Sequence, residues 1–353
     1  MDATDLNKKL QYLREYDRHL RIMEICGSHT AAISRSGLRQ LVSPDIELIS
    51  GPGCPVCVTP SSYIDRLIEL AGENVVCSFG DMLRVPGSRE SLSEAKGRGL
   101  RIEMLYSPLN MLDMARKKPE KTFIFAAVGF ETTIPAYALL LAEALEEKIE
   151  NVKLLTALKT MPETVGMLCA PDAGIDGFLA PGHVCAVRGY KEYEILAKKF
   201  GRGFAVSGFE AKELVDALYE LVKGLDRKDD NEGFIVNCYR KAVDYEGNKK
   251  AAELTDRFFE KCDSVWRGIG NIRNSGLILK EEYRKFDAGS FGLNGDKARY
   301  EACRCGDVIC GKIKPDMCPL FKKSCTPLSP KGACMVSAEG ACRAYYDQEP
   351  VKQ

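Results

Sequence analysis

Three absences narrow the classes of protein to which this 353-residue chain can belong. Its 50 basic and 50 acidic side chains leave no net charge, so no overall field would attract nucleic acid or anionic lipid. Its most apolar runs, residues 122–130 and 136–144, are much shorter than the roughly 20 residues that span a bilayer. Its charged amino terminus lacks the apolar core of a secretory signal. We therefore expect a cytoplasmic protein that binds neither nucleic acid nor membrane.

Phosphate-binding motifs and histidines are also scarce. The glycines of residues 51–53 and 201–203 lack the lysine and hydroxyl of a Walker loop and the spacing of a dinucleotide fingerprint, so we expect no nucleotide site. The chain has three histidines. With so few, the placement of His29 three residues after Cys26 stands out.

Cysteine, by contrast, is plentiful. The chain has fifteen, and seven of them lie between Cys303 and Cys342. Reducing cytosol keeps thiols free and a large domain does not need disulfide staples, so these cysteines predict metal or redox chemistry. The carboxyl-terminal part of the chain therefore differs from the rest in its high density of cysteines.

A second concentration of thiols lies in residues 51–57, Gly-Pro-Gly-Cys-Pro-Val-Cys. An apolar run at 46–49 precedes it, which predicts that Cys54 and Cys57 follow the carboxyl end of a strand, where α/β proteins place their chemistry. A Cys-x-x-Cys turn can cycle between dithiol and disulfide or can hold a soft metal. The motif alone leaves both uses open.

Short apolar runs alternate with helical patterns along most of the chain. This alternation predicts an α/β fold with two doubly wound parallel-sheet (Rossmann-like) domains, followed by a more helical carboxyl-terminal domain. Charged breaks near 115–121 and 226–232 place the domains at 1–120, 121–230 and 231–353, with a helix in residues 1–20 and a clear helical segment at 249–267. The expected strands are 21–25, 46–49, 74–77, 122–128, 152–158, 177–180 and 203–206.

Three other positions at strand ends are candidates for chemistry. Cys26 and His29 would suit a nucleophile and its base, or two metal ligands, although a buried core cysteine beside a helix cap explains them equally well. His183 follows a strand in a Pro-Gly turn, where either a turn contact or a role in a cleft is open. Glu131 opens a helix, where capping alone favours a carboxylate.

The cysteine-rich tail gives the strongest metal signal. Its thiols are widely spaced, no histidine accompanies them, and the paired Cys-x2-Cys spacing of structural zinc sites is missing. An iron-sulfur cluster takes four thiolates and tolerates such spacing. We rank a cluster ahead of zinc, and zinc ahead of scattered structural cysteines.

Five motifs of the sequence resemble those of the [NiFe]-hydrogenase maturation factors of the HypD family and occur in the same order. The resemblance covers nearly the whole chain. Ser28 and Ala338 depart from the family pattern without removing a thiol or an imidazole. The motifs are MEICGSHT at 23–30, GPGCPVCVTP at 51–60, GFETT at 129–133, APGHV at 180–184, and a tail running from CRCG at 303–306 through CPLF at 318–321 to MVSAEGAC at 335–342.

The resemblance implies a maturation scaffold with redox activity, not a conventional metabolic enzyme. Its expected task is to assemble or carry the Fe(CN)2CO group of the hydrogenase, as a monomer in a complex with a small HypC-type chaperone and a HypE-type cyanide donor. Cys26 would hold the iron, Cys54 and Cys57 would supply electrons, and His29, Glu131 and His183 would complete the reactive site.

The resemblance also implies a [4Fe-4S] cluster in the third domain. Three ligands map onto Cys318, Cys325 and Cys342, and the fourth onto Cys305 with Cys303 as the alternative. Cys310 and Cys334 are left without an assigned bond.

Two other functions compete with the scaffold. A thiol-disulfide oxidoreductase of broader range would use Cys54 and Cys57 with a cluster as electron source. A structural zinc adaptor would contain no iron.

Overall fold

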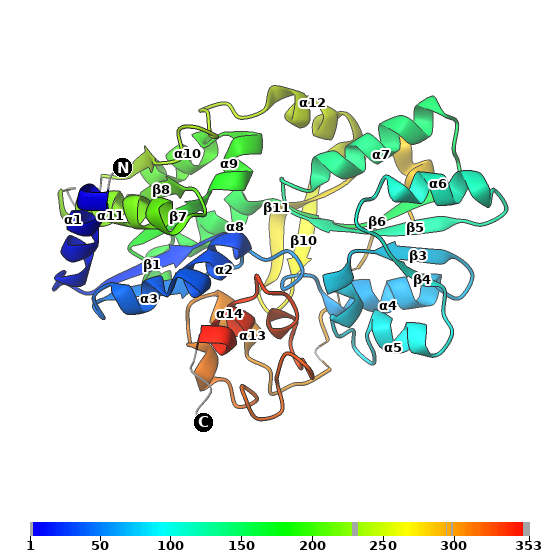
Figure 1. The fold of residues 1–353 in the computed structure, drawn as a ribbon. Helices are drawn as coiled ribbons and strands as arrows, with labels where there is room; N and C mark the ends of the chain where they lie inside the picture. Colours follow the sequence, from blue (N-terminus) through cyan, green and yellow to red (C-terminus); the bar gives the residue numbers. More distant parts are fainter. Residues whose placement is uncertain (1–2, 228–231, 294, 298, 349–353) are drawn as a thin grey trace.

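Two sheets organise the computed structural model, which describes residues 3–227, 232–293, 295–297 and 299–348 (Figure 1). The first sheet has five strands, and every neighbouring pair is parallel. Its spatial order is β2 (Ile46–Ser50), β1 (Leu20–Glu24), β7 (Gly177–Pro181), β8 (Gly203–Ser207) and β9 (Phe234–Asn237).

The second sheet has six strands and a mixed direction. The strands β6, β5, β3 and β4 pair in parallel, whereas the hairpin of β10 and β11 adds two antiparallel strands at the edge next to β6. The spatial order is β10 (Phe259–Trp266), β11 (Gly270–Leu279), β6 (Val152–Lys159), β5 (Phe123–Gly129), β3 (Val75–Ser78) and β4 (Ile102–Met104). The predicted α/β class with two mostly parallel sheets is confirmed.

Helices cover the sheets, so central strands are buried along their whole length. All seven residues of β5 are buried, which explains the unbroken apolar run of its sequence. The helices are α1 (Ala3–Arg14), α2 (Gly27–Ser36), α3 (Leu38–Leu41), α4 (Ser61–Leu70), α5 (Leu92–Gly97), α6 (Asn110–Lys117), α7 (Ile134–Glu146), α8 (Met161–Leu168), α9 (Gly182–Arg188), α10 (Lys191–Phe200), α11 (Ala211–Arg227), α12 (Lys249–Phe258), α13 (Cys305–Ile309) and α14 (Ala341–Gln348).

The chain passes repeatedly between the two sheets. Residues 1–120 supply β1 and β2 to the first sheet but β3 and β4 to the second, and residues 121–230 also contribute to both. Residues 231–353 add β9 to the first sheet and the β10–β11 hairpin to the second. Each sheet therefore takes strands from all three predicted domains. The domain boundaries at residues 120 and 230 remain a prediction.

Two helix predictions need correction. The amino-terminal helix ends at Arg14 and β1 begins at Leu20, so it does not extend to residue 20. The helix predicted at 249–267 is wrong in its second half, because α12 ends at Phe258 and the next residue starts β10. Antiparallel pairing with β11 stabilises this strand, and such tertiary pairing outweighs local helical preference.

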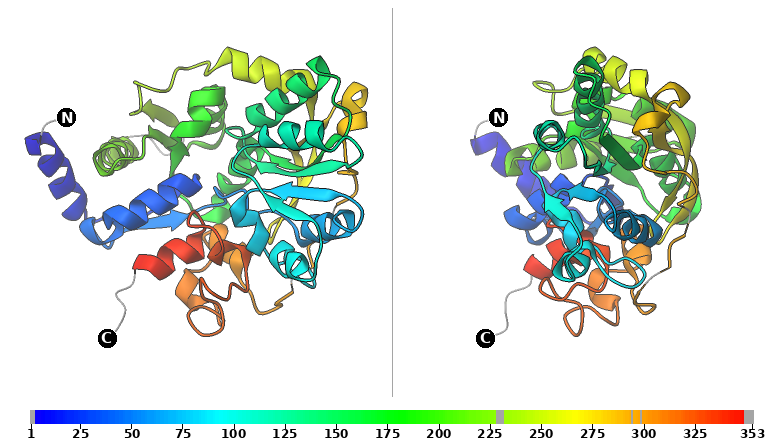
Figure 2. Two further views of the ribbon diagram at one scale, coloured as in Figure 1. Left: turned by 45° about the vertical axis from the view of Figure 1, so that its right-hand side comes forward. Right: turned by 90° about the vertical axis from the view of Figure 1, so that its right-hand side faces the viewer.

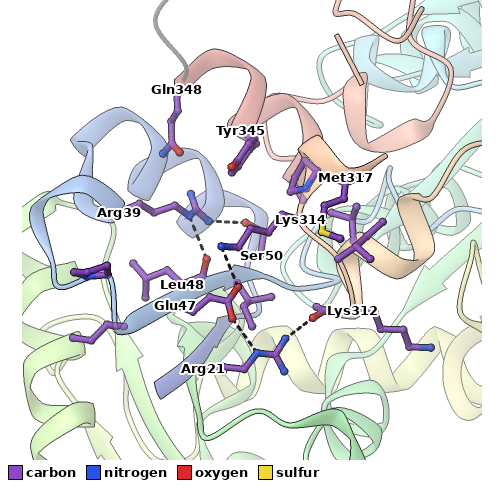
Figure 3. A pocket seen from close by; sticks show the side chains of 18 of the residues that line it. Arg21, Arg39, Glu47, Leu48, Ser50, Lys312, Lys314, Met317, Tyr345 and Gln348 are labelled. Atoms are coloured by element: carbon purple, nitrogen blue, oxygen red, sulfur yellow. Dashed lines mark hydrogen bonds and ion pairs between the residues drawn. The ribbon is translucent and has the colours of Figure 1, made fainter. Parts of the chain in front are cut away.

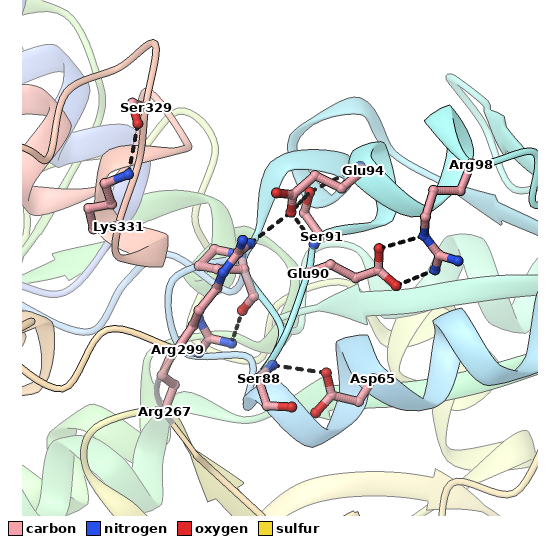
Figure 4. A network of polar contacts seen from close by, with 11 residues as sticks. Asp65, Ser88, Glu90, Ser91, Glu94, Arg98, Arg267, Arg299, Ser329 and Lys331 are labelled. Atoms are coloured by element: carbon pink, nitrogen blue, oxygen red, sulfur yellow. Dashed lines mark hydrogen bonds and ion pairs between the residues drawn. The ribbon is translucent and has the colours of Figure 1, made fainter.

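The cysteine-rich tail forms a third lobe beneath both sheets, built from short helices and turns (Figures 1 and 2). Polar contacts attach it to the helices of the second sheet, as Figure 4 shows for Arg299 and Glu94. Arg299 pairs with Glu94 of α5 at 2.8 Å, and the Arg84 guanidinium donates to the carbonyl of Pro327 at 3.0 Å. Within the described part of the chain, no helix has the length and apolarity to cross a membrane.

Candidate functional site

Four loops meet at one edge of the first sheet. Because β2, β1, β7 and β8 are parallel neighbours, the loops that follow their carboxyl ends lie side by side, as at the ligand-binding edge of other α/β sheets. The loop after β1 carries Cys26, and the loop after β2 carries Cys54 and Cys57. His183 follows β7, and Phe209 follows β8. Motifs far apart in the sequence are thus brought together by strand order.

The Cys26 backbone is packed directly against the Cys54 loop. The Gly27 amide donates to the carbonyl of Gly53 at 2.8 Å, and a Cβ on Gly53 would overlap the backbone of Cys26. Cys26 itself is the N-cap of α2. The glycine at 53 therefore permits the close approach of two thiol-bearing loops.

Burial raises the pKa of the Cys26 thiol to about 12. The thiol is therefore protonated at neutral pH, and a metal ion would have to displace that proton to bind the sulfur. A soft metal does so readily.

A buried carboxyl lies beneath Cys26 and was missed by sequence reasoning. The Cys26 amide donates to Glu24 Oε2 at 3.2 Å, and the Thr30 hydroxyl donates to the other oxygen. Burial raises the pKa of Glu24 to about 7. The signal that could have found it is a single acidic residue inside the apolar run of residues 22–25.

Cys54 and Cys57 form a disulfide whose Cα atoms are 5.3 Å apart. Both residues are buried, and the Cys57 sulfur lies 3.9 Å from the carbonyl of Ala333, next to Cys334 of the tail. The pair therefore bridges the space between the Cys26 loop and the cysteine-rich lobe.

The two candidate histidines contact the same aromatic ring. Phe209 lies with its ring centroid 4.7 Å from that of His29 and 3.8 Å from that of His183. His29 is fully buried, and its Nε2 lies 3.2 Å from the Ser207 carbonyl and 3.0 Å from that of Gly208, so this nitrogen carries the proton and donates.

The other ring nitrogen of His29 has no hydrogen-bond partner among the described residues. Burial lowers the pKa of His29 to about 4, so the ring is neutral near pH 7 and Nδ1 keeps its lone pair. His183, in contrast, is exposed to solvent. The structure thus brings both histidines to one place but gives them different environments.

Glu131 reaches the site from the second sheet. It follows β5, and its Oε1 accepts from the Met161 amide at the start of α8 at 2.8 Å. Its Oε2 is buried without a partner among the described residues, and burial raises the pKa of this carboxyl to about 7. Cys185, which the sequence did not single out, interacts electrostatically with both Glu131 and Cys26.

The tail places Glu339 against the Cys26 loop. The Ser28 hydroxyl donates to Glu339 Oε1 at 2.7 Å, and a Cβ on Gly27 would overlap the same side chain. This contact closes the site from the side of the cysteine-rich lobe. Sequence reasoning did not single out Glu339 as a site residue.

Six of the seven tail cysteines are neighbours in space. The sulfurs of Cys303 and Cys305 are 3.2 Å apart, and their hydrogen bond lowers the pKa of the Cys303 thiol to about 7. The thiol of Cys305 also hydrogen-bonds those of Cys334 and Cys342. Cys325 interacts electrostatically with Cys303 and with Cys318. Cys310 has Lys312 and Asp307 as its charged neighbours instead.

This donor set fits an iron-sulfur cluster. All of its side chains are soft thiols, and Gly332 leaves room beside Cys303 and Cys305 that a Cβ would fill. Across the described residues, no three or more His, Cys, Asp or Glu side chains converge as a single metal ion requires. A [4Fe-4S] cluster spreads its four thiolates over four irons. Cys334, fully buried among these thiols, is a candidate that spacing did not reveal.

Comparison with known proteins gives the family. A family model described as "HypD: Hydrogenase formation hypA family" matches residues 2–349. The chain belongs to the HypD family. It is 42% identical to the hydrogenase maturation factor HypD of Escherichia coli (strain K12) over 314 residues, which are 86% of this chain and 83% of that protein.

Two further relatives agree with this assignment. The HypD of Rhodobacter capsulatus is 41% identical over 87% of this chain and 83% of its own length. The HypD of Azotobacter vinelandii is 39% identical over 86% of this chain and 83% of its own length. The resemblance carried by the five motifs is confirmed, and the chain is a hydrogenase maturation factor.

Proposed function

We propose that this chain is a cytoplasmic scaffold that assembles or carries the Fe(CN)2CO group of [NiFe]-hydrogenase, together with a HypC-type chaperone and a HypE-type cyanide donor. The observation that carries the proposal is the contact of the Gly27 amide with the Gly53 carbonyl. This contact supports the proposal because it holds the loop of Cys26 against the loop of the Cys54–Cys57 disulfide, and the HypD family membership supplies the context.

In this proposal Cys26 holds the iron that is being built into the group. Iron carrying cyanide and carbon monoxide is electron-rich and soft, so a thiolate suits it. His29 offers the unpaired Nδ1 as an acceptor in the buried site, while His183 lies at its exposed side. Glu131, with its pKa raised to about 7 by burial, can hold or release a proton near neutral pH.

Cys54 and Cys57 act as the electron source. Release of cyanide from a thiocyanate, R–S–CN, consumes two electrons and yields R–S⁻ and CN⁻. Oxidation of two thiols to a disulfide releases two electrons and two protons, so one turnover of the pair balances one cyanide.

The tail thiols would hold the [4Fe-4S] cluster. We assign Cys318, Cys325 and Cys342 as ligands with Cys305 as the fourth, and Cys303 and Cys334 are the neighbouring thiols that could replace it. When bound, such a cluster supplies single electrons. The contact of the Cys57 sulfur with Ala333 supports electron delivery to the disulfide from this side.

Infrared spectroscopy on anaerobically purified protein tests the proposal. Wild-type protein should show bands of metal-bound cyanide and carbonyl, and Cys26→Ala should lose them while keeping the iron of the cluster. Cys77→Ala is the matched control, because Cys77 is equally buried but lies in β3 of the other sheet. Its bands should remain.

A second arm tests the electron source. A Cys54→Ser, Cys57→Ser double variant should assemble the iron group at least tenfold more slowly. Normal assembly by this variant would rule out the electron role of Cys54 and Cys57. If the wild-type protein catalysed the reduction of unrelated disulfides and showed no infrared bands, the alternative function, a thiol-disulfide oxidoreductase, would be favoured.

A further inference from the structure

A large cavity, which Cys26 does not line, runs along β2. Its volume is about 880 Å³, and it lies between β2, α3 and the cysteine-rich lobe (Figure 3). A cavity of this size is in the range of small-molecule sites. None of the residues assigned above to the iron, dithiol or cluster sites lines it.

The lining of this cavity has a surplus of positive charge. Its described residues include four permanent cations, Arg21, Arg39, Lys312 and Lys314, against one carboxylate, that of Glu47. Glu47 is shared, since it pairs with Arg21 at 3.0 Å and with Lys314 at 3.6 Å. The pocket therefore attracts an anion with more than one negative charge.

Other charged groups close to the cavity do not cancel this surplus. Glu24 lies behind Arg39 and is buried, with its pKa raised to about 7. Asp316 lies at the rim, where its carboxylate accepts from the Tyr345 hydroxyl at 3.4 Å. His19 adds a further imidazole to the lining.

The cations come from two different parts of the fold. Arg39 extends from α3 and is held by the Leu48 carbonyl at 3.3 Å and the Ser50 hydroxyl at 2.8 Å, so its guanidinium is fixed in place. Lys312 and Lys314 are exposed on the tail, where Lys314 extends toward Glu47 and Lys312 points away from Arg39 (Figure 3). A ligand between them would contact the first sheet and the cysteine-rich lobe at the same time.

One side of the cavity is apolar. Leu48, Ile313 and Met317 line it, and Met317 keeps 64% of its surface exposed although it is a large hydrophobic residue. The Tyr345 ring adds an aromatic surface from α14. Such a surface beside fixed cations suits a molecule with an apolar body and an anionic group.

We propose that this pocket binds a small organic anion, one that carries phosphate or carboxylate groups beside an apolar body, and that the bound ligand joins the tail to the first sheet. Arg39 is the fixed anion-binding group, and Lys312 with Lys314 closes over the ligand from the tail. The inference does not depend on the proposed iron chemistry, because it needs no metal and no partner protein.

Titration calorimetry on the full chain tests this inference with three probes: phenyl phosphate, terephthalate and the neutral benzyl alcohol. We expect saturable binding of at least one anion, with a Kd below about 1 mM, and no saturable binding of the alcohol. Phenyl phosphate alone would identify a phosphate site, and terephthalate alone a carboxylate site. Both results support the proposal.

Charge-removing variants locate the site. Lys312→Gln with Lys314→Gln should weaken binding at least tenfold, and both residues are exposed, so the fold should survive. Lys117→Gln with Lys118→Gln removes the same charge from the exposed end of α6 and should leave the Kd unchanged. The proposal is overturned if neither anion binds, if the alcohol binds as tightly, or if the tail variant binds like wild type.

Discussion

At the scale of single residues, the site is built from ionisable groups that burial has shifted toward their neutral forms. Glu24, Glu131, His29 and Cys26 all follow this direction. Neutral groups are less costly to bury than charged ones, and each of these groups can gain or lose a proton when the charge around it changes. Proton uptake or release by these groups would therefore offset charge that enters the site.

Glu131 gives a testable consequence for stability. Its pKa in the folded chain, about 7, lies above the ordinary 4.5, so the folded state binds the proton more tightly than the unfolded state. The stabilising contribution of Glu131 is then fully present below pH 4.5 and is lost as the pH rises through 7. In Glu131→Gln, the fall in the free energy of unfolding over this pH range should be smaller by about 2–3 kcal/mol.

Urea unfolding at several pH values between 5 and 7 measures the effect. The variant should show a shallower fall in the free energy of unfolding than wild type, with the fall due to Glu24 still present. The exposed Glu146→Gln, in α7, is the control and should keep the wild-type slope. An unchanged slope in Glu131→Gln would show that this carboxyl is already ionised in the fold.

At the scale of elements, the contact between the loops after β1 and β2 decides the geometry of the site. Gly53 is required there because a side chain would overlap the backbone of Cys26. Gly53→Ala should therefore destabilise the chain by about 1–3 kcal/mol, the usual cost of overpacking.

The midpoint of urea unfolding checks this expectation. Gly97→Ala is the matched control, since a methyl group added at the end of α5 would meet no atom of another element within 4 Å, and alanine favours helix. This control should be neutral or slightly stabilising. Equal midpoints for the two variants would contradict the close packing of Gly53 on Cys26.

At the scale of the whole molecule, Arg267 lies where the three parts of the fold meet. It occupies the turn between β10 and β11, its amide donates to the Val58 carbonyl at 2.8 Å, and its guanidinium donates to that of Pro86 at 2.7 Å (Figure 4). It interacts electrostatically with Asp296 and with the thiols of Cys303, Cys305 and Cys334.

A buried cation beside the cluster thiols should favour the reduced, more negative state of a bound cluster. Arg267→Gln should lower the ratio of reduced to oxidised cluster about tenfold at a fixed potential, a shift of ~59 mV for one electron. Arg267→Lys keeps the charge and should shift less. Dye-mediated redox titration followed by electron paramagnetic resonance measures both, and an unshifted potential in Arg267→Gln with normal iron content would contradict the role.

Much of this architecture follows from the sequence alone. The seven expected strands are present, because apolar runs that end in glycine, proline or small polar residues determine strands locally. Residue type and spacing also singled out Cys26, Cys54, Cys57 and His29, and the junction of a strand with a helix singled out Glu131. Their roles stay predictions.

Only the tertiary structure decided which of these residues meet. The order β2-β1-β7-β8 brings together loops separated by more than a hundred residues, and no local pattern encodes that order. The same holds for Glu24, Cys334 and Arg267, whose roles depend on what surrounds them after folding. The strand β10 was misread as helix because its pairing partner, β11, and not its own periodicity, determines its conformation. Local preference determines most of the elements, whereas long-range burial and pairing decide the rest, place all of them and shift the pKa values of the groups that they enclose.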